Sequence, residues 1–488
     1  MTHDHLLATY QRLRSLTRHV LERWLPVAAM LLALLAANDS QARAQNETAL
    51  ETFDQVWNQV REQYFDYERI EDDWEQAREE LRPLAAERSQ PGDLRPLLQD
   101  LLGRIGESHF VVVPGQTINR LAELDRSSRA DDNQGNQRDP ASGAPSIEAM
   151  TGAASRADTV TTGLTLRLVD NQVRVASVRP DSPADRAGIQ PGWRVEALGG
   201  SELADTLASL ADIDSDDERR RAVVLLELGL QGMASLVPAE SEVELRLINH
   251  QDEVVEKRLR GQALSHATTR IGNLPPMAFD FSLERQDIEQ GCVQVVAFSS
   301  WVPALTETFQ GERESVFACQ GLVIDLRGNP GGVLTTMVPL AADLFDESVV
   351  LGSLLRSDAR LDFRVLPRRV AMDGQRLQPF AGPVAILIDS LSASTSEMFA
   401  AGMQATGRAQ LFGERSAGMA LPSQMLPLAN GDFLMYAFAD YRDSQDRRIE
   451  GVGAVPDVPV PLNDDNIHQQ PSPVLQAALD WINQELSP

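Results

Sequence analysis

The sequence contains almost no lysine: one of its 44 basic residues is a lysine, Lys257, and the others are arginine. Acidic residues number 71, which gives a formal net charge of -27 and argues against binding to nucleic acids or anionic membranes. Only two cysteines are present, and no cysteine or histidine spacing is typical of a zinc site. The composition therefore gives no indication of a metal or an organic cofactor.

Long apolar runs are also scarce, and the one that stands out lies near the N-terminus. Several arginines precede the run LPVAAMLLALLAA, residues 25–37, and Ala42-Arg43-Ala44 follows with the small-x-small pattern of a cleavage site. The run is too short for a confident membrane span. We expect residues 1–44 to be a signal peptide or, alternatively, an uncleaved N-terminal anchor, which is then the only membrane contact. The rest of the protein is expected to be periplasmic or otherwise exported.

The two cysteines occupy equivalent positions, because each precedes an apolar, strand-like run. Cys292 comes before VQVVAF and Cys319 before LVIDL. If these strands are parallel neighbours, their starts lie side by side, and the cysteines can form a disulfide in an oxidising compartment. The alternative is two buried free thiols.

Patterns along the chain divide the remainder into five parts. Residues 45–125 repeat apolar residues every three or four positions, which predicts a helical N-terminal domain. Residues 126–158 are small and polar, as expected for a flexible linker. Short alternating strands occupy residues 159–262. In residues 265–465 buried strands such as GLVIDLR alternate with helical stretches such as VLTTMVPLAADLFD, which predicts an α/β core with a mainly parallel sheet. Residues 466–488 form a tail that ends in an amphipathic helix.

The β-rich part resembles a PDZ domain of the kind found in bacterial proteases. It reads as two strands joined at Asp170-Asn171, then DSPADRAGIQPGW with a short helix, then an acidic helix-like insertion over residues 201–240. The resemblance implies that Gly163, Leu164, Thr165 and Leu166 bind the free C-terminus of a peptide, which adds to the edge of the sheet. The alternative is a structural β-module that binds no peptide.

One serine lies where a catalytic nucleophile is expected. Ser394 falls between the apolar strand AILID and the helix SEMFAAGMQ, where unpaired N–H groups and the helix dipole stabilise negative charge. A helix cap is the alternative role for this serine. The glycines of the loop Arg327-Gly-Asn-Pro-Gly-Gly332 permit close approach of the backbone to a ligand, although the loop is also consistent with an ordinary tight turn.

These motifs together resemble one family. LVIDLRGNPGG, SASTSE, GRAQLFGE and IEGVGAVPDVPV, in this order after a PDZ-like part, resemble the carboxyl-terminal processing (tail-specific) serine peptidases. The resemblance covers about residues 160–465. It implies that Ser394 is the nucleophile and that the amides of Gly331 or Gly332 and of Thr395 form the oxyanion hole.

The sequence departs from that family at the general base. The best-known members activate the serine with a lysine 25 residues later, and here that position is Met419, whose thioether cannot transfer a proton. The tricorn-like branch uses Ser-His-Ser-Glu instead. Ser108-His109 in GESHF and Glu450 before Pro456-Asp457 match that arrangement. An imidazole with its ordinary pKa of about 6.5 can accept the serine proton near neutral pH, so activity is expected to change between pH 5 and 8.

The sequence thus predicts an exported serine endopeptidase that cleaves unfolded proteins or peptides through an acyl-enzyme at Ser394, with His109 as general base and Ser108 and Glu450 orienting it. Its partners are expected to be protein or peptide substrates, recognised through their free C-termini. Two alternatives are an inactive PDZ-containing scaffold and a protein that binds apolar ligands, since loss of the lysine fits both.

Overall fold

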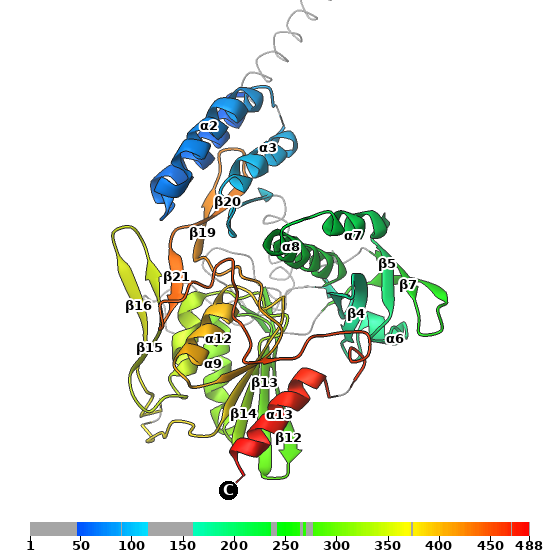
Figure 1. The fold of residues 1–488 in the computed structure, drawn as a ribbon, viewed down its shortest axis with the longest axis vertical. Helices are drawn as coiled ribbons and strands as arrows, with labels where there is room; N and C mark the ends of the chain where they lie inside the picture. The colour runs from blue at the N-terminus through cyan, green and yellow to red at the C-terminus, as the bar shows by residue number, and fades with distance from the viewer. Residues whose placement is uncertain are drawn as a thin grey trace, which may run out of the picture.

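The computed structural model describes residues 46–88, 90–115, 160–235, 242–263, 267–269, 277–371, 374–469 and 471–487. The expected export segment and the expected linker over residues 126–158 lie outside these ranges. Figure 1 shows N-terminal helices at one end of the molecule, a β-rich unit beside the α/β core, and α13 across the core sheet. Within the described ranges, no helix combines the length and apolar character needed to cross a bilayer.

The core is built on a six-stranded sheet in the order β12-β13-β14-β17-β18-β22. All neighbouring pairs are parallel except β12 and β13 at one edge, so the sheet is mixed. The strands are β12 (Phe281–Ile288), β13 (Gly291–Phe298), β14 (Gly321–Asp325), β17 (Val384–Ile388), β18 (Gln410–Gly413) and β22 (Val458–Pro459).

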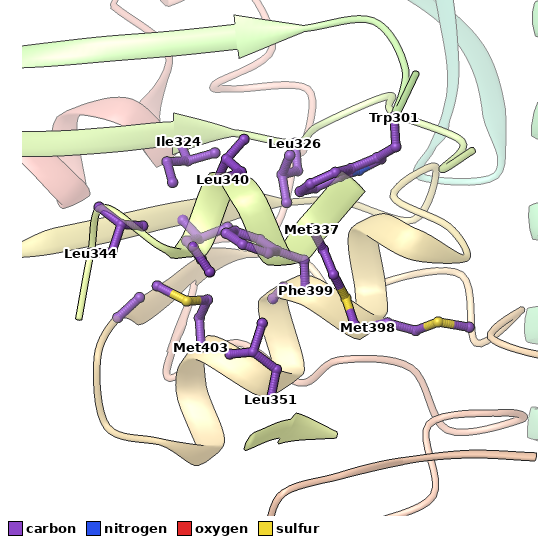
Figure 2. Close-up of a cluster of buried hydrophobic side chains, with 14 of the residues drawn as sticks. Trp301, Ile324, Leu326, Met337, Leu340, Leu344, Leu351, Met398, Phe399 and Met403 are labelled. Carbon is purple, nitrogen blue, oxygen red and sulfur yellow. The ribbon is translucent and has the colours of Figure 1, made fainter. Parts of the chain in front are cut away.

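Helices cover both faces of this sheet, which explains why its central strands are continuous apolar runs. One face packs with Trp301, Met337 and Phe399 in the largest buried cluster, part of which Figure 2 shows. The other face packs on α13. The helices are α9 (Pro303–Gly311), α10 (Arg313–Val316), the 3-10 turn η1 (Leu334–Thr336), α11 (Met337–Ala341), α12 (Thr395–Ala405) and α13 (Pro473–Glu485).

A disulfide joins Cys292 to Cys319 at the starts of β13 and β14. The parallel register pairs Val293 with Gly321, which places the two cysteines side by side. The bond lies at the opposite end of the strands from the turn that carries Ser394.

The N-terminal helices share a hydrophobic core with a hairpin from the C-terminal half of the chain. Phe53, Trp57 and Trp74 pack with Leu434 and Tyr436. The elements are a helix over residues 46–63, α2 (Tyr67–Ala85), α3 (Pro91–Gly103), β1 (Val111–Val113), β19 (Ser423–Pro427) and β20 (Phe433–Ala437). Because β1 pairs with β20, the segment that holds His109 is anchored to the β19–β20 hairpin.

The β-rich unit contains a sheet in the order β3-β4-β5-β7-β8 and a long helix, α8, that packs on β3. The hairpin turns at Asp170-Asn171, where both residues have positive φ, as a two-residue turn of type I′ requires. The elements are β2 (Val160–Thr161), β3 (Leu164–Val169), β4 (Gln172–Val178), α6 (Pro183–Arg186), β5 (Arg194–Leu198), β6 (Ser201–Glu202), α7 (Ala204–Ala211), α8 (Asp216–Ser235), β7 (Glu242–Ile248), β8 (Val254–Arg260) and β9 (Gln262–Ala263).

Smaller sheets complete the described fold. They are β10 (Ala267–Thr269) with β11 (Met277–Phe279), and β15 (Val349–Leu355) between β16 (Arg360–Val365) and β21 (Asp440–Asp443). The helix expected over VLTTMVPLAADLFD is shorter than the pattern indicates. It ends at Ala341, because the buried carboxylate of Asp343 binds Arg313 and Arg368 and its carbonyl accepts the N–H of Phe380.

Candidate active site

Ser394 lies on a strained turn between β17 and α12. Its φ of 54° and ψ of -119° are unusual for a residue other than glycine. Such strain at a strand-to-helix junction is typical of catalytic nucleophiles, because the sharp turn presents the side chain. The backbone N–H of Ser394 donates to the carbonyl of Met419 and to Glu397 Oε2, both at 3.0 Å.

Residues 415–420, here called the strap, run beside this turn and are held by a buried glutamate. Glu397 is fully buried and accepts hydrogen bonds from Ser416 Oγ at 2.6 Å, from the N–H of Gly418 at 2.6 Å and from the N–H of Met419 at 2.9 Å. Burial raises the pKa of Glu397 to about 7, although every contact donates to the carboxylate and favours its charged form.

Ser108, His109 and Glu450 form a hydrogen-bonded chain. Ser108 Oγ lies 2.7 Å from His109 Nδ1 and donates to Glu450 Oε2 at 2.9 Å, and the N–H of Ser108 donates to Glu450 Oε1 at 2.9 Å. The hydroxyl of Ser108 has one proton, which goes to the carboxylate. His109 Nδ1 must therefore carry the donated proton, which leaves Nε2 with a free lone pair.

Burial changes the basicity of this chain. It lowers the pKa of His109 to about 4 and raises the pKa of Glu450, whose hydrogen bonds to Ser108 and Ala420 oppose that rise. His109 is thus neutral at pH 7. The expected change of activity between pH 5 and 8 needs revision, because protonation of the buried imidazole moves to lower pH.

Two further contacts fix the loop that carries His109, whose φ of 64° is also strained. Glu107 accepts hydrogen bonds from Tyr64 Oη at 2.6 Å and from Arg448 Nη2 at 2.7 Å. Arg448 lies two residues before Glu450, so the same segment that supplies the carboxylate also holds the histidine loop. Sequence reasoning missed Glu107, because one charged residue among many in a helical region carries no signal.

The strap links the histidine chain to the nucleophile. The N–H of Ala420 donates to Glu450 Oε2 at 2.7 Å, and the adjacent Met419 carbonyl binds Ser394. The hydrogen bonds among the described residues include none between His109 and Ser394. The structure therefore brings Ser108, His109 and Glu450 into direct contact and connects Ser394 to them through the strap.

The two glycines expected at the oxyanion hole differ in whether their N–H already has an acceptor. The N–H of Gly331 donates to Asn329 Oδ1 at 3.0 Å and is thereby occupied. Among the described residues, nothing accepts the N–H of Gly332 or of Thr395. The glycine turn lies directly against the nucleophile, since a Cβ on Gly331 would be 2.7 Å from Ser394 Cβ and 2.9 Å from the N atom of Thr395.

Helix α8 of the β-rich unit packs on the strap. Val224 and Leu228 form an apolar cluster with Ala393, Ala417 and Met419, so the methionine in the lysine position faces apolar side chains. On the same side of α8, Arg220 binds the carbonyl of Gly451, next to Glu450 in the sequence. Arg221 donates to the carbonyl of Gly106 at 3.0 Å. In this conformation α8 covers the apolar side of the strap.

The same helix occupies the edge of β3 that was expected to bind a peptide. Gln231 donates to the carbonyl of Leu164 and accepts the N–H of Leu166, both at 3.1 Å, and Glu227 accepts the N–H of Leu168 at 2.7 Å. The N–H of Gly163 donates to Thr161 Oγ1. Thr165 pairs with Ser177 of β4, so the expected peptide-binding residues have partners within the chain.

A buried arginine joins the β-rich unit to the core beside the nucleophile turn. Arg167 binds Glu227 on α8 at 2.9 Å, Asp389 after β17 at 2.7 Å and Glu414 at 2.6 Å. The three carboxylates satisfy a guanidinium that is almost fully enclosed, as a buried charge requires. The position of α8 on β3 is thus coupled to the strand that precedes Ser394.

Comparison with known families gives this site a context. The sequence profile of peptidase family S41 matches residues 289–460, which contain the Ser394 turn, the strap and Glu450. The chain carries a peptidase family S41 domain. The profile of the Tricorn protease C1 domain matches residues 45–103, which precede His109. The S41 match includes Glu450, and the region just after the C1 match contributes Ser108 and His109.

Relatives of the S41 domain are processing proteases by name. The chain is 26% identical over 317 residues to a carboxyl-terminal-processing protease of Synechocystis sp., covering 64% of this chain and 65% of that protein. It is 26% identical over 291 residues to carboxyl-terminal-processing peptidase 2, chloroplastic, of Arabidopsis thaliana, covering 59% and 49%. The matches thus span between about half and two thirds of the length of these relatives.

Solved structures share the fold. The photosystem II D1 C-terminal processing protease aligns over 90% of this chain and 99% of its own, with a TM-score of 0.51 and 17% identity. Mature CPAF aligns over 90% and 97%, with a TM-score of 0.54 and 13% identity. At these identities the likeness concerns the fold, and it agrees with an α/β core that contains mixed sheets.

Proposed function

We propose that the protein is a serine peptidase in which Ser394 is the nucleophile and His109 is the general base. The observation that carries the proposal is the chain from Glu450 through Ser108 to His109, which leaves Nε2 free to accept a proton. Ser108 and Glu450 are 342 positions apart in the sequence. Glu450 also binds the N–H of Ala420, so these hydrogen bonds reach the strap that holds Ser394. The S41 domain and the names of its relatives support this activity.

In the proposed reaction His109 Nε2 accepts the proton of Ser394 as Oγ attacks the substrate carbonyl. The resulting oxyanion accepts hydrogen bonds from the N–H groups of Gly332 and Thr395. His109 then donates the proton to the leaving amine, and the acyl-enzyme forms as the peptide bond breaks. Water hydrolyses the ester by the same steps in reverse order, which restores Ser394 and releases the new carboxyl terminus. Approach of Nε2 to Oγ is expected in the substrate complex.

Glu450 stabilises the imidazolium that forms during each step. The imidazolium Nδ1–H donates to Ser108 Oγ, and the Ser108 hydroxyl donates to the ionised carboxylate, so Glu450 stabilises the positive charge through these hydrogen bonds without taking the proton. This arrangement offsets the low pKa of the buried imidazole at the moment when its charge is needed. No step requires a lysine, which agrees with an apolar side chain at Met419.

The substrates we propose are unfolded proteins or peptides outside the cytoplasm, cleaved within the chain and selected by their C-termini. Relatives named for carboxyl-terminal processing support the reaction, and the sequence of residues 1–44 supports export. The unit over residues 159–262 is proposed to be PDZ-like and to receive the C-terminus along β3. Binding there requires Gln231 and Glu227 to leave the edge of β3, because a peptide needs the same backbone groups.

Hydrolysis of casein by the chain that begins at residue 45 tests the proposal. We expect the wild type to cleave casein and both Ser394→Ala and His109→Ala to lose at least about 1,000-fold in rate. A fluorophosphonate probe should label the wild type and leave Ser394→Ala unlabelled. A wild type that is not labelled and binds peptides or apolar dyes instead would favour the scaffold or the apolar-ligand carrier.

A further inference from the structure

We infer that Asn329 and Ser396 are positioning residues that set the distance between the two N–H groups of the oxyanion hole. The inference rests on the proposed peptidase reaction. One N–H belongs to Gly332 in the loop after β14, and the other belongs to Thr395 in the first turn of α12. Because these donors come from different elements, something must hold the two elements in register for both to reach one oxygen atom.

Asn329 connects the two elements through both its backbone and its side chain, and it is 1% exposed. Its carbonyl accepts the N–H of Ala393, the residue before the nucleophile, at 3.0 Å. Its side-chain Oδ1 accepts the N–H of Gly331 at 3.0 Å, and Nδ2 donates to the carbonyl of Phe298 at 2.8 Å. Asn329 thus ties the glycine turn to the core through its side chain and to the nucleophile turn through its carbonyl.

Ser396 completes the connection from the helix side. Its hydroxyl lies 3.0 Å from both the carbonyl oxygen and Oδ1 of Asn329, so its proton is shared between them, and it accepts Nε1–H of Trp301 at 2.9 Å. The residue is fully buried one position after Thr395. Displacement of this hydroxyl would therefore move the first turn of α12 relative to the loop.

Trp301 holds the glycine turn from the other side. Its N–H donates to the carbonyl of Gly331 at 3.0 Å, and its carbonyl accepts the N–H of Val333 at 2.6 Å. Gly332 is bracketed by these two bonds, and a Cβ at that position would lie 2.2 Å from the Trp301 carbonyl oxygen. The indole ring is fixed by edge-to-face packing on Phe298 and by contact with Phe399. The direction of the Gly332 N–H is thus determined by its neighbours.

The chemistry explains why this register matters more for the transition state than for substrate binding. An oxyanion hole works when its donors lie about 2.7–3.1 Å from the oxygen that becomes negative. A misplacement of about 1 Å costs on the order of 100-fold in rate. Neither Asn329 nor Ser396 is placed at the reacting atoms, so their loss should lower kcat and leave KM nearly unchanged.

A pair of matched inhibitors tests the inference. A peptide aldehyde, derived from a mapped casein cleavage site, forms a hemiacetal whose oxygen enters the hole, whereas the corresponding peptide alcohol has no electrophilic carbonyl. We expect Ser396→Ala and Asn329→Ala to weaken aldehyde binding about 10- to 100-fold and to lower kcat by a similar factor, with alcohol binding unchanged. The control is Ser353→Ala, which removes a buried hydroxyl bonded to Asp362 in the β15–β16 hairpin.

The double variant sharpens the result. Because both side chains act in one connection, the combined loss should be smaller than the product of the single losses. An unchanged ratio of alcohol to aldehyde affinity in either folded single variant would overturn the inference. If Asn329→Ala fails to fold, Ser396→Ala decides alone. A wild type that does not cleave casein would instead overturn the proposed function, and the inference with it.

Discussion

Glu397 and Glu450 both bind the strap with buried carboxylates, but they join it to different parts of the chain. Glu397 collects donors from Ser394 and from the strap itself, all within 22 residues. Glu450 collects one donor from the strap and two from Ser108, which lies 342 residues away. The first glutamate therefore shapes the nucleophile turn, and the second makes the base depend on the docking of the N-terminal helices.

The largest difference between the two should appear in Glu450→Gln. An amide nitrogen in the position of Oε2 would donate to Ser108 Oγ, which would then donate to His109 Nδ1 and force the proton onto Nε2. We expect a loss of about 1,000- to 10,000-fold in kcat, because the imidazole would be the wrong tautomer. Peptide hydrolysis rates measure this effect, and unfolding free energy should fall by about 1–3 kcal/mol, because the buried N–H of Ala420 would face the amide nitrogen.

Glu107→Gln is the matched control. Glu107 lies in the loop that carries His109, but its carboxylate does not bind the imidazole. It should lower the rate far less than Glu450→Gln. Equal losses in the two variants would contradict a specific role for Glu450 in the tautomer.

Glu397→Gln should have a smaller effect on rate and a larger one on stability. Its NH2 group would face two donors that now bind one carboxylate oxygen, which costs about 1–3 kcal/mol of unfolding free energy for each buried donor left unpaired. Chemical denaturation measures this loss. The raised pKa of Glu397 means that its contribution to stability is present below pH 4.5 and is lost as the pH rises through about 7, so the variant should remove that dependence.

The variant Met419→Lys tests whether position 419 of the strap can hold the lysine that the best-known members of the family have there. An ammonium would lie against Val224 and Leu228 at a partly buried position, so we expect a lower midpoint of thermal unfolding and no gain in activity. In a His109→Ala background the lysine should not restore cleavage. Met419→Leu conserves volume and should cost less than about 1.5 kcal/mol. Restored cleavage would show that a Ser-Lys pair can still form.

Removal of the disulfide should affect stability alone. Cys292 and Cys319 are 27 positions apart in the sequence, and closure of that loop is worth about 3–4 kcal/mol by chain entropy. The bond lies away from the edge of the sheet that carries Ser394. A double Cys292→Ser, Cys319→Ser variant should therefore unfold earlier and retain its kcat, and a large loss of kcat would place the bond in the active-site scaffold.

Local patterns in the sequence predicted much of the core and less of the site. Runs such as VAILI at β17 indicate buried strands because both faces of a parallel sheet are covered. The sequence Ser394-Thr-Ser-Glu397 is also a capping-box pattern, and this signal could have identified Glu397. Periodicity predicts that α8 has an apolar face, but it does not reveal that Val224 contacts the strap while Gln231 binds β3. Such contacts depend on how distant elements pack.

The rate of Ser394 labelling by a fluorophosphonate, measured from pH 3 to 8, tests the central claim most directly. The buried His109 is neutral above its pKa of about 4, so the rate should fall as acid protonates it near that pH and stay level from pH 5 to 8. His109→Ala should remove both the labelling and its pH dependence. Labelling that persists unchanged in His109→Ala would contradict the account, because the serine would then have another base.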